Sequence, residues 1–212
     1  RVIGPPRLVT TYVPYNAQDV SDSGGLSGDC GDFASHCQSG YTFFRHTTST
    51  RSTADQYDAQ HEWIYIVYDA TKPGTEVDTG TTYGSLQPGR GSQSGVFFLR
   101  YDGASGAHTI PTLIDDQPVG HQTFADISAD GGVLHTLWWD SRNDRCYSPT
   151  RPIGNCADRS VVPSLDVYAA RSSDNGNSWT GKARITDVTS NPNYEQFGGR
   201  TVPFAGDYLW IS

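Results

Sequence analysis

The run from Ser172 to Trp179 constrains the fold of this chain more than any other part of its sequence. It fits the pattern S-x-D-x-G-x-[ST]-W and follows Val167–Arg171, a short run that reads as a strand. In such a turn the carboxylate of Asp174 accepts backbone N–H bonds, Gly176 takes a positive φ, and Trp179 packs beside the next strand. The residues Ser172, Asp174, Gly176 and Trp179 therefore predict a β-hairpin with a structural turn.

The composition favours an all-β protein with many turns. Among 212 residues there are 23 Gly, 12 Pro and 12% aromatic residues, and strongly periodic helical stretches are absent from the sequence. The formal net charge of −8 argues against nucleic acid or an anionic membrane as a partner, because such partners need basic patches that release counterions. No apolar run approaches the roughly 18 residues that span a membrane.

The four cysteines fall into two close pairs, Cys30 with Cys37 and Cys146 with Cys156. Three connectivities are open, and local pairing would close two polar loops rich in Gly, Asp, Ser and Pro. The competing zinc site would need C-x₂₋₄-C spacing, which neither pair has. We therefore expect two local disulfides and a secreted, extracellular protein.

An internal repeat extends the strand pattern along the chain. Val96–Arg100 and Val167–Arg171 are both short β-branched or aromatic runs that end in Arg, and they lie 71 residues apart. Tyr41–Arg45 is a third copy of this run. Repeats of about this length with four short strands each are typical of β-propeller blades.

Two further pairs of residues keep the same spacing. Asp69 and Asp140 each end an aromatic-rich strand-like run and are 71 residues apart, while Asp102 and Asp174 are 72 apart. Asp102 would then begin a degenerate copy of the turn that has lost its Trp. We interpret Asp69 and Asp140 as structural residues of the blade turns rather than as catalytic residues.

These markers define one blade in detail. Its four strands are expected near Phe124–Ile127, Leu134–Trp139, Leu165–Arg171 and Lys182–Thr186. The chain as a whole divides into approximate blades 1–57, 58–120 and 121–200, with the start of a next blade at 201–212. Because propellers close with at least four blades, we expect about three blades of a larger ring. An open three-blade module that closes by oligomerisation is the alternative.

With this turn, the stretches His61–Asp69, Gly131–Arg142 and Phe204–Tyr208 resemble the secreted bacterial sialidase-like proteins, in which the turn is the Asp-box of the BNR repeat. The resemblance covers roughly residues 40 to 212 and implies a six-bladed β-propeller of four-stranded antiparallel blades. It implies an exo-acting glycoside hydrolase for extracellular glycans, whose site is completed by the remaining blades in the same or another chain. A non-catalytic propeller that binds extracellular glycans or proteins, and a purely structural segment, are the alternatives.

The resemblance also implies what a sialidase site must contain. Three arginines hold the substrate carboxylate, an Asp acts as acid/base, and a Tyr activated by Glu is the nucleophile. The Phe/Tyr-Arg-Ile-Pro motif that carries the first of these arginines does not occur in this sequence, so whether the chain is an enzyme stays open.

Residues at the starts of inner strands are the first candidates, because these positions line the central opening of a propeller. By the repeat, Asp126, Asp207 and Tyr208 are the candidate catalytic residues, and Arg200 and Glu195 are candidate substrate-binding residues. Three of them have a structural alternative: Asp126 can cap the backbone of a neighbouring strand, Tyr208 can pack in the channel wall, and Arg200 can pair with a carboxylate.

The spacing of potential ligands predicts no cofactor and no metal. The one candidate is a calcium site of oxygen ligands from Asp140–Asp144 and Asp158, in the loop that carries Cys146 and Cys156. It lacks the spacing of an EF-hand.

Overall fold

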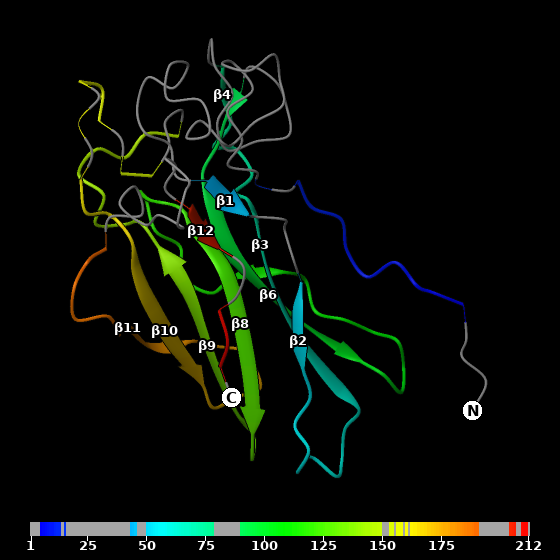
Figure 1. Ribbon diagram of the computed structural model, residues 1–212. Coiled ribbons are helices and arrows are strands. Elements are labelled where there is room, and N and C mark those ends of the chain that lie inside the picture. Colours follow the sequence, from blue (N-terminus) through cyan, green and yellow to red (C-terminus); the bar gives the residue numbers. More distant parts are fainter. Residues whose placement is uncertain are drawn as a thin grey trace.

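The structure is a computed structural model, which describes residues 5–13, 15, 43–45, 50–78, 90–149, 153–154, 156–158, 160, 162–190, 204–206 and 209–211. Every regular element within these ranges is a β-strand, and most strands belong to two four-stranded antiparallel sheets (Figure 1). The expected all-β class is confirmed.

The first sheet is a meander whose strands lie side by side in chain order. They are β2 (Arg51–Thr53), β3 (Trp63–Thr71), β6 (Ser94–Asp102) and β7 (Thr112–Leu113). The long strands β3 and β6 pair along their whole length, from Trp63 opposite Asp102 to Thr71 opposite Ser94. Because β2 pairs with β3, the sheet begins before residue 58, where this blade was expected to start.

The second sheet repeats the same meander. Its strands are β8 (Gln122–Asp130), β9 (Val133–Asp140), β10 (Asp166–Ser172) and β11 (Thr180–Arg184). Each overlaps one of the four strands expected from the sequence, because alternating apolar residues and the turn after Ser172 fix both register and direction. The outermost strand, β11, is exposed along its whole length, as the edge of a sheet is.

Two small ribbons complete the described strands. β4 (Val77–Asp78) pairs with β5 (Arg90–Gly91) in the connection between β3 and β6. β1 (Phe43–Arg45) pairs in parallel with β12 (Phe204–Gly206), which lies near the other end of the sequence. The repeat had placed Tyr41–Arg45 in the position of the third strands β6 and β10, so this pairing differs from the expectation. A three-residue strand carries too little pattern to specify its partner.

The hydrophobic core lies between the two sheets. Strand β8 packs against β3 and β2, and inward side chains of both sheets share one cluster. Its buried members are Tyr65, Val67, Val96, Phe98, Ile114, Ala125, Ile127, Leu134, Trp138, Tyr168 and Ala170. Burial of each large side chain contributes about 1.5–3 kcal/mol, so the two meanders form one packed unit.

The turn from Ser172 to Trp179 joins β10 to β11 and is closed by its own side chains. Oδ1 of Asp174 accepts the Ser178 N–H at 2.9 Å, and Oδ2 accepts the Ser178 hydroxyl at 2.6 Å. These bonds, the hydroxyl bond first, lower the pKa of Asp174 to about 2. Gly176 has φ +84° and donates its N–H to Ser172 Oγ at 2.8 Å. The local geometry is therefore that of the expected Asp-box turn.

A simpler turn occupies the equivalent place between β6 and β7. Oδ1 of Asp102 accepts the Ala104 N–H at 2.9 Å, and Oδ2 accepts the Ser105 hydroxyl at 2.7 Å. These bonds lower the pKa of Asp102, the Ser105 bond most strongly. Both meanders thus use an Asp carboxylate to close the turn between their third and fourth strands.

The Asp-box turn also connects the second sheet to the first. The Tyr65 hydroxyl donates to Oδ1 of Asn175 at 3.1 Å, and Nη1 of Arg100 donates to the Asn175 carbonyl at 2.9 Å. The rings of Trp179 and Phe98 meet edge to face, with centroids 5.2 Å apart. Contacts of this kind hold the outer edge of one meander against its neighbour.

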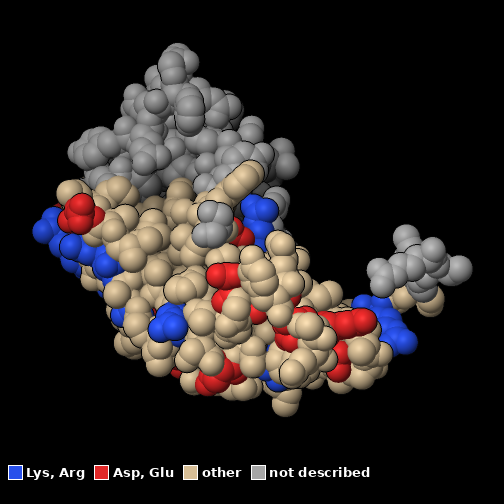
Figure 2. Space-filling model, turned by 90° about the horizontal axis from the view of Figure 1, so that it is seen from below, with Lys and Arg blue, Asp and Glu red and all other residues tan. Residues whose placement is uncertain are grey.

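Charges of both signs are present on the surface. On the face seen in Figure 2, acidic side chains lie between groups of basic ones, and neither sign covers the whole face. Although the net charge is −8, the acidic side chains on this face do not form one continuous patch.

Candidate functional site

The long connections of both meanders leave from the same end of the molecule. β3 and β9 finish there, and β6, β8 and β10 begin there (Figure 1). We call this the loop-bearing end. Loops placed on a rigid scaffold often carry binding and catalytic residues, so this end is the first place to look for a site.

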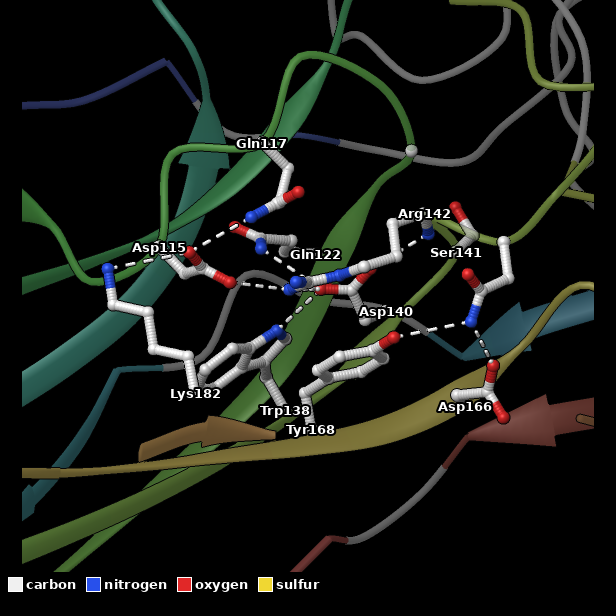
Figure 3. Close-up of polar contacts among 12 residues, drawn as sticks. Asp115, Gln117, Gln122, Trp138, Asp140, Ser141, Arg142, Asp166, Tyr168 and Lys182 are labelled. Atoms are coloured by element: carbon white, nitrogen blue, oxygen red, sulfur yellow. Dashed lines mark hydrogen bonds and ion pairs between the residues drawn. The ribbon is translucent and has the colours of Figure 1, made fainter. Parts of the chain in front are cut away.

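Asp140, the last residue of β9, lies at the centre of a polar network at the loop-bearing end (Figure 3). Its side chain is fully buried. Oδ2 accepts the indole N–H of Trp138 at 2.8 Å and the amide of Gln122 at 3.0 Å, while Oδ1 accepts the backbone N–H of Arg142 at 2.8 Å. These donors fix the carboxylate in one orientation.

Arg142 lies between two carboxylates. Its Nη2 is 2.6 Å from Oδ2 of Asp140 and 2.6 Å from Oδ2 of Asp115, and its guanidinium carbon lies 3.8 Å from the ring centroid of Tyr168. Burial alone would lower the pKa of Arg142, but Asp140 and Asp115 outweigh burial and raise it. The arginine therefore stays charged and is held by the protein's own acidic groups.

Asp115 belongs to the connection between the two sheets. Its Oδ1 accepts the amide of Gln117 at 3.0 Å and lies 3.4 Å from Nζ of Lys182 on β11. Burial would raise the pKa of Asp115, but the bonds from Arg142 and Gln117 outweigh burial and lower it. The carboxylate is therefore ionised at neutral pH and ties the connection to the second sheet.

Asp166, the first residue of β10, is a second buried acidic centre. Oδ2 accepts the amide of Asn143 at 2.8 Å and the Thr189 hydroxyl at 3.1 Å. Oδ1 accepts the Thr186 hydroxyl at 2.9 Å and lies 3.5 Å from Nη1 of Arg184. Asn143 also donates to the Tyr168 hydroxyl at 3.3 Å, which links this centre to Arg142 through the tyrosine ring.

The network is suited to hold strand ends together. Asp140, Asp115 and Asp166 all accept several hydrogen bonds from protein donors, and Arg142 gives its bonds to two of these carboxylates. A buried ion pair whose carboxylates accept hydrogen bonds in this way gives a rigid support. The loops of this end are therefore anchored on a fixed base, and Arg142 is already engaged by the protein.

Asp126 lies on β8, two residues after an irregular step. Phe124 has φ +55°, and the register with β9 shifts between Thr123 and Asp126. Oδ2 of Asp126 accepts the backbone N–H of Ile211 at 2.9 Å. The structure thus shows this carboxylate capping the backbone of a neighbouring segment, the structural alternative considered for it.

Outside the described residues lie Asp207, Tyr208, Arg200, Glu195, Cys30 and Cys37.

The second cysteine pair forms the expected disulfide. Cys146 and Cys156 are bonded in the connection between β9 and β10. Asp144 supports this loop, because its carboxylate accepts the N–H of Cys146 at 2.8 Å and of Gly154 at 2.7 Å. No group of three or more metal-ligating side chains gathers in the described part of the chain.

Sequence reasoning found only part of the network. It identified Asp140 through the repeat and Arg142 only as part of a candidate calcium loop, and it did not select Asp115 or Asp166. The available signal was the pair of Asp69 and Asp140 at equal spacing, since Asp69 lies near the end of β3, Asp140 ends β9 and both are buried. Asp115, which pairs with Arg142, lies in a connection without a recognisable sequence pattern. Its place in the network is seen only once the two sheets pack together.

No protein-family model, curated protein or solved structure matches this chain. In the described ranges no helix is long and apolar enough to cross a membrane. Fold and site together define an all-β protein of two packed four-stranded meanders, with a buried acidic network and a disulfide-closed loop at one end.

Proposed function

We propose that this chain is a segment of a sialidase-like β-propeller that recognises glycans outside the cell. The observation that carries this proposal is the contact between the meanders. Two consecutive four-stranded meanders pack face to face, and the Asp-box turn of the second docks on Tyr65, Phe98 and Arg100 of the first. Successive blades of a propeller repeat this relation around a ring, and about six blades would complete it.

An extracellular location is part of the proposal. The Cys146–Cys156 bond closes a loop in the connection between β9 and β10, whose described residues form no strand. Such bonds persist in oxidising compartments and are rare in the cytosol.

Recognition rather than hydrolysis is the role that the loop-bearing end supports better. A glycosidase needs two carboxyl groups about 5–10 Å apart that can reach the sugar from both sides of the bond. At this end Asp115, Asp140 and Asp166 are buried and engaged with protein donors. We propose that they hold the loops in place and that the loops contact the glycan, either alone or with neighbouring blades.

Exo-acting hydrolysis of a sialoside is the second candidate. Its specific support is the Asp-box turn together with Asp126, which lies on β8, the edge strand of its sheet that would be innermost in a propeller blade. In this version Asp126 and Asp207 share the acid/base work, Tyr208 is the nucleophile, and Arg200 and Glu195 contact the substrate.

The test has two parts. A glycan array probed with the labelled protein should retain it on a defined set of glycans, and a fluorogenic sialoside should stay intact. Release of the fluorophore that is lost in Asp126→Ala and Asp207→Ala would favour the hydrolase instead. Absence of both retention and release would contradict glycan recognition altogether and leave the structural-segment alternative.

A further inference from the structure

A groove opens on the face of the first sheet that points away from the second sheet. The segment 5–13 approaches this face (Figure 1), and the Thr71 N–H donates to the Val13 carbonyl at 2.9 Å. Between this segment and the sheet lies a cavity of about 640 Å³. This volume falls within the range of roughly 300–1,000 Å³ that is usual for small-molecule sites.

Three aromatic rings form the floor and one wall of the groove. Tyr68 on β3 and Phe97 on β6 are cross-strand partners, with ring centroids 5.6 Å apart, and Tyr12 lies 4.9 Å from Tyr68 on its other side. Tyr68 is only 3% exposed, so its neighbours hold it fixed, while Tyr12 is 38% exposed. The groove therefore offers aromatic surface on a rigid base.

The rim of the groove carries oxygen atoms. The hydroxyls of Thr10 and Thr11 come from the N-terminal segment, and Glu76 comes from the connection after β3. Oε2 of Glu76 accepts the Gly74 N–H at 2.9 Å, which positions the carboxylate at the groove. Among the described residues that line the groove, Glu76 is the one charged residue, and none is Lys, Arg or His.

We propose that this groove binds a neutral sugar chain. The C–H faces of a sugar ring are apolar and pack against aromatic rings, while its hydroxyls need hydrogen-bond acceptors at the edge. Tyr12 and Phe97 supply the first kind of contact, and Glu76 with Thr11 supplies the second. A negative charge in a lining whose described residues include no cation disfavours an acidic sugar, so the charge of the groove favours neutral rings.

This site is separate from the loop-bearing network and does not depend on the function proposed for it. A neutral sugar can bind at Tyr12 whether or not the loops recognise a glycan. The two proposals are therefore tested by different residues.

The binding test uses named sugars and the whole chain. Lactose, cellobiose and maltose are titrated into ¹⁵N-labelled protein up to about 50 mM, with 3′-sialyllactose as the acidic comparison. We expect at least one neutral disaccharide to shift the amide signals of Tyr12 and Thr71 in a saturable way, and sialyllactose to bind at least about fivefold more weakly than lactose.

Variants assign the binding to the groove. Tyr12→Ala should weaken neutral-sugar binding by about tenfold, whereas Tyr57→Ala, which removes a tyrosine that is 78% exposed elsewhere, should leave it unchanged. Glu76→Gln keeps the shape of the groove and should reduce the discrimination against sialyllactose. This second variant keeps the test valid if Tyr12→Ala proves unstable.

Three results would overturn the proposal. They are the absence of any shift with all three neutral sugars, equal binding of sialyllactose that Glu76→Gln does not change, and neutral-sugar binding that Tyr12→Ala leaves intact. If any of these results is found and the glycan array is positive and unaffected by Tyr12→Ala, the groove is excluded while glycan recognition by the loops survives.

Discussion

Gly176, in the Asp-box turn of the second sheet, lies directly against the aromatic ring of Phe98 in the first sheet. No side chain fits at this position, because a Cβ on Gly176 would overlap the ring atoms of Phe98. The glycine of the motif thus serves two needs, since its φ of +84° closes the turn and its missing side chain lets the turn approach the neighbouring sheet. The turn is therefore part of the interface between the two meanders.

Gly176→Ala should destabilise the protein by at least about 2 kcal/mol, because the new methyl group overlaps Phe98 and the backbone has a positive φ. Gly181→Ala is the matched control. Gly181 also has a positive φ, +62°, but has open space around it, so only the backbone cost of about 1 kcal/mol should remain. Urea denaturation measures both free energies of unfolding. Equal losses in the two variants would show that the contact with Phe98 does not matter.

Arg142→Met should cost about 3–5 kcal/mol at neutral pH, because it leaves the carboxylates of Asp140 and Asp115 buried without their shared cation. Arg171→Met removes an exposed arginine from β10 and should change stability by less than about 0.5 kcal/mol. Both are measured by urea denaturation at pH 7.

The pH dependence of the Arg142→Met loss tests its cause. In the native protein Arg142 contributes to the lowered pKa of Asp115. Without Arg142, burial is opposed only by Gln117 and Lys182, so this pKa should rise above its native value. Protonation then removes the unpaired charge, so the loss relative to the native protein should shrink between pH 7 and about pH 5. A loss that stays constant with pH would point to lost packing on Tyr168 instead.

The sequence allowed the second sheet to be predicted and left much of the site unpredicted. Strands β9 and β10 lie within a residue of their expected bounds, because each is a short run rich in apolar and aromatic residues and the turn at Asp174 fixes where β10 ends. A local sequence pattern of this kind, over seven or eight residues, is enough to predict a strand.

Long-range pairing could not be predicted in the same way. The strand Phe43–Arg45 pairs in parallel with a strand far along the sequence, because the partner of Phe43 is Phe204, 161 positions later. Asp115 reaches Arg142 only because β7 and β9 end near each other, and no spacing rule marks that meeting. Contacts between residues of two different sheets produce no periodic pattern in the sequence.

Replacing Cys146 and Cys156 together by Ala should lower the free energy of unfolding by about 2–3 kcal/mol, because the bond closes a loop with a sequence separation of 10. Asp144 should keep part of the loop in place through its bonds to the N–H groups of residues 146 and 154. Denaturation in urea without a reductant measures the change. An unchanged free energy would mean that the hydrogen bonds of Asp144 alone define the loop.

His121 should make the protein sensitive to mild acid. Its ring is fully buried beside Tyr15 and Tyr147, with centroids 4.9 and 5.2 Å away, and burial lowers its pKa from 6.5 to about 3. Because the folded pKa lies below the unfolded value, the unfolded chain binds the proton more tightly. The contribution of neutral His121 is therefore complete above about pH 6.5 and is lost as the pH falls toward the folded value.

The expected slope is up to about 1.4 kcal/mol per pH unit between pH 6 and pH 4, in addition to that of the carboxylates. His121→Gln removes this titration, so its stability should be lower at pH 7 but should fall less steeply with acid. His135→Gln, which replaces an exposed histidine on β9, should keep the native slope. Urea denaturation at several pH values gives all three slopes. If His121→Gln and the native protein lose stability in parallel over this interval, another group is responsible, because a histidine that is neutral in the folded state must add its own proton uptake to unfolding.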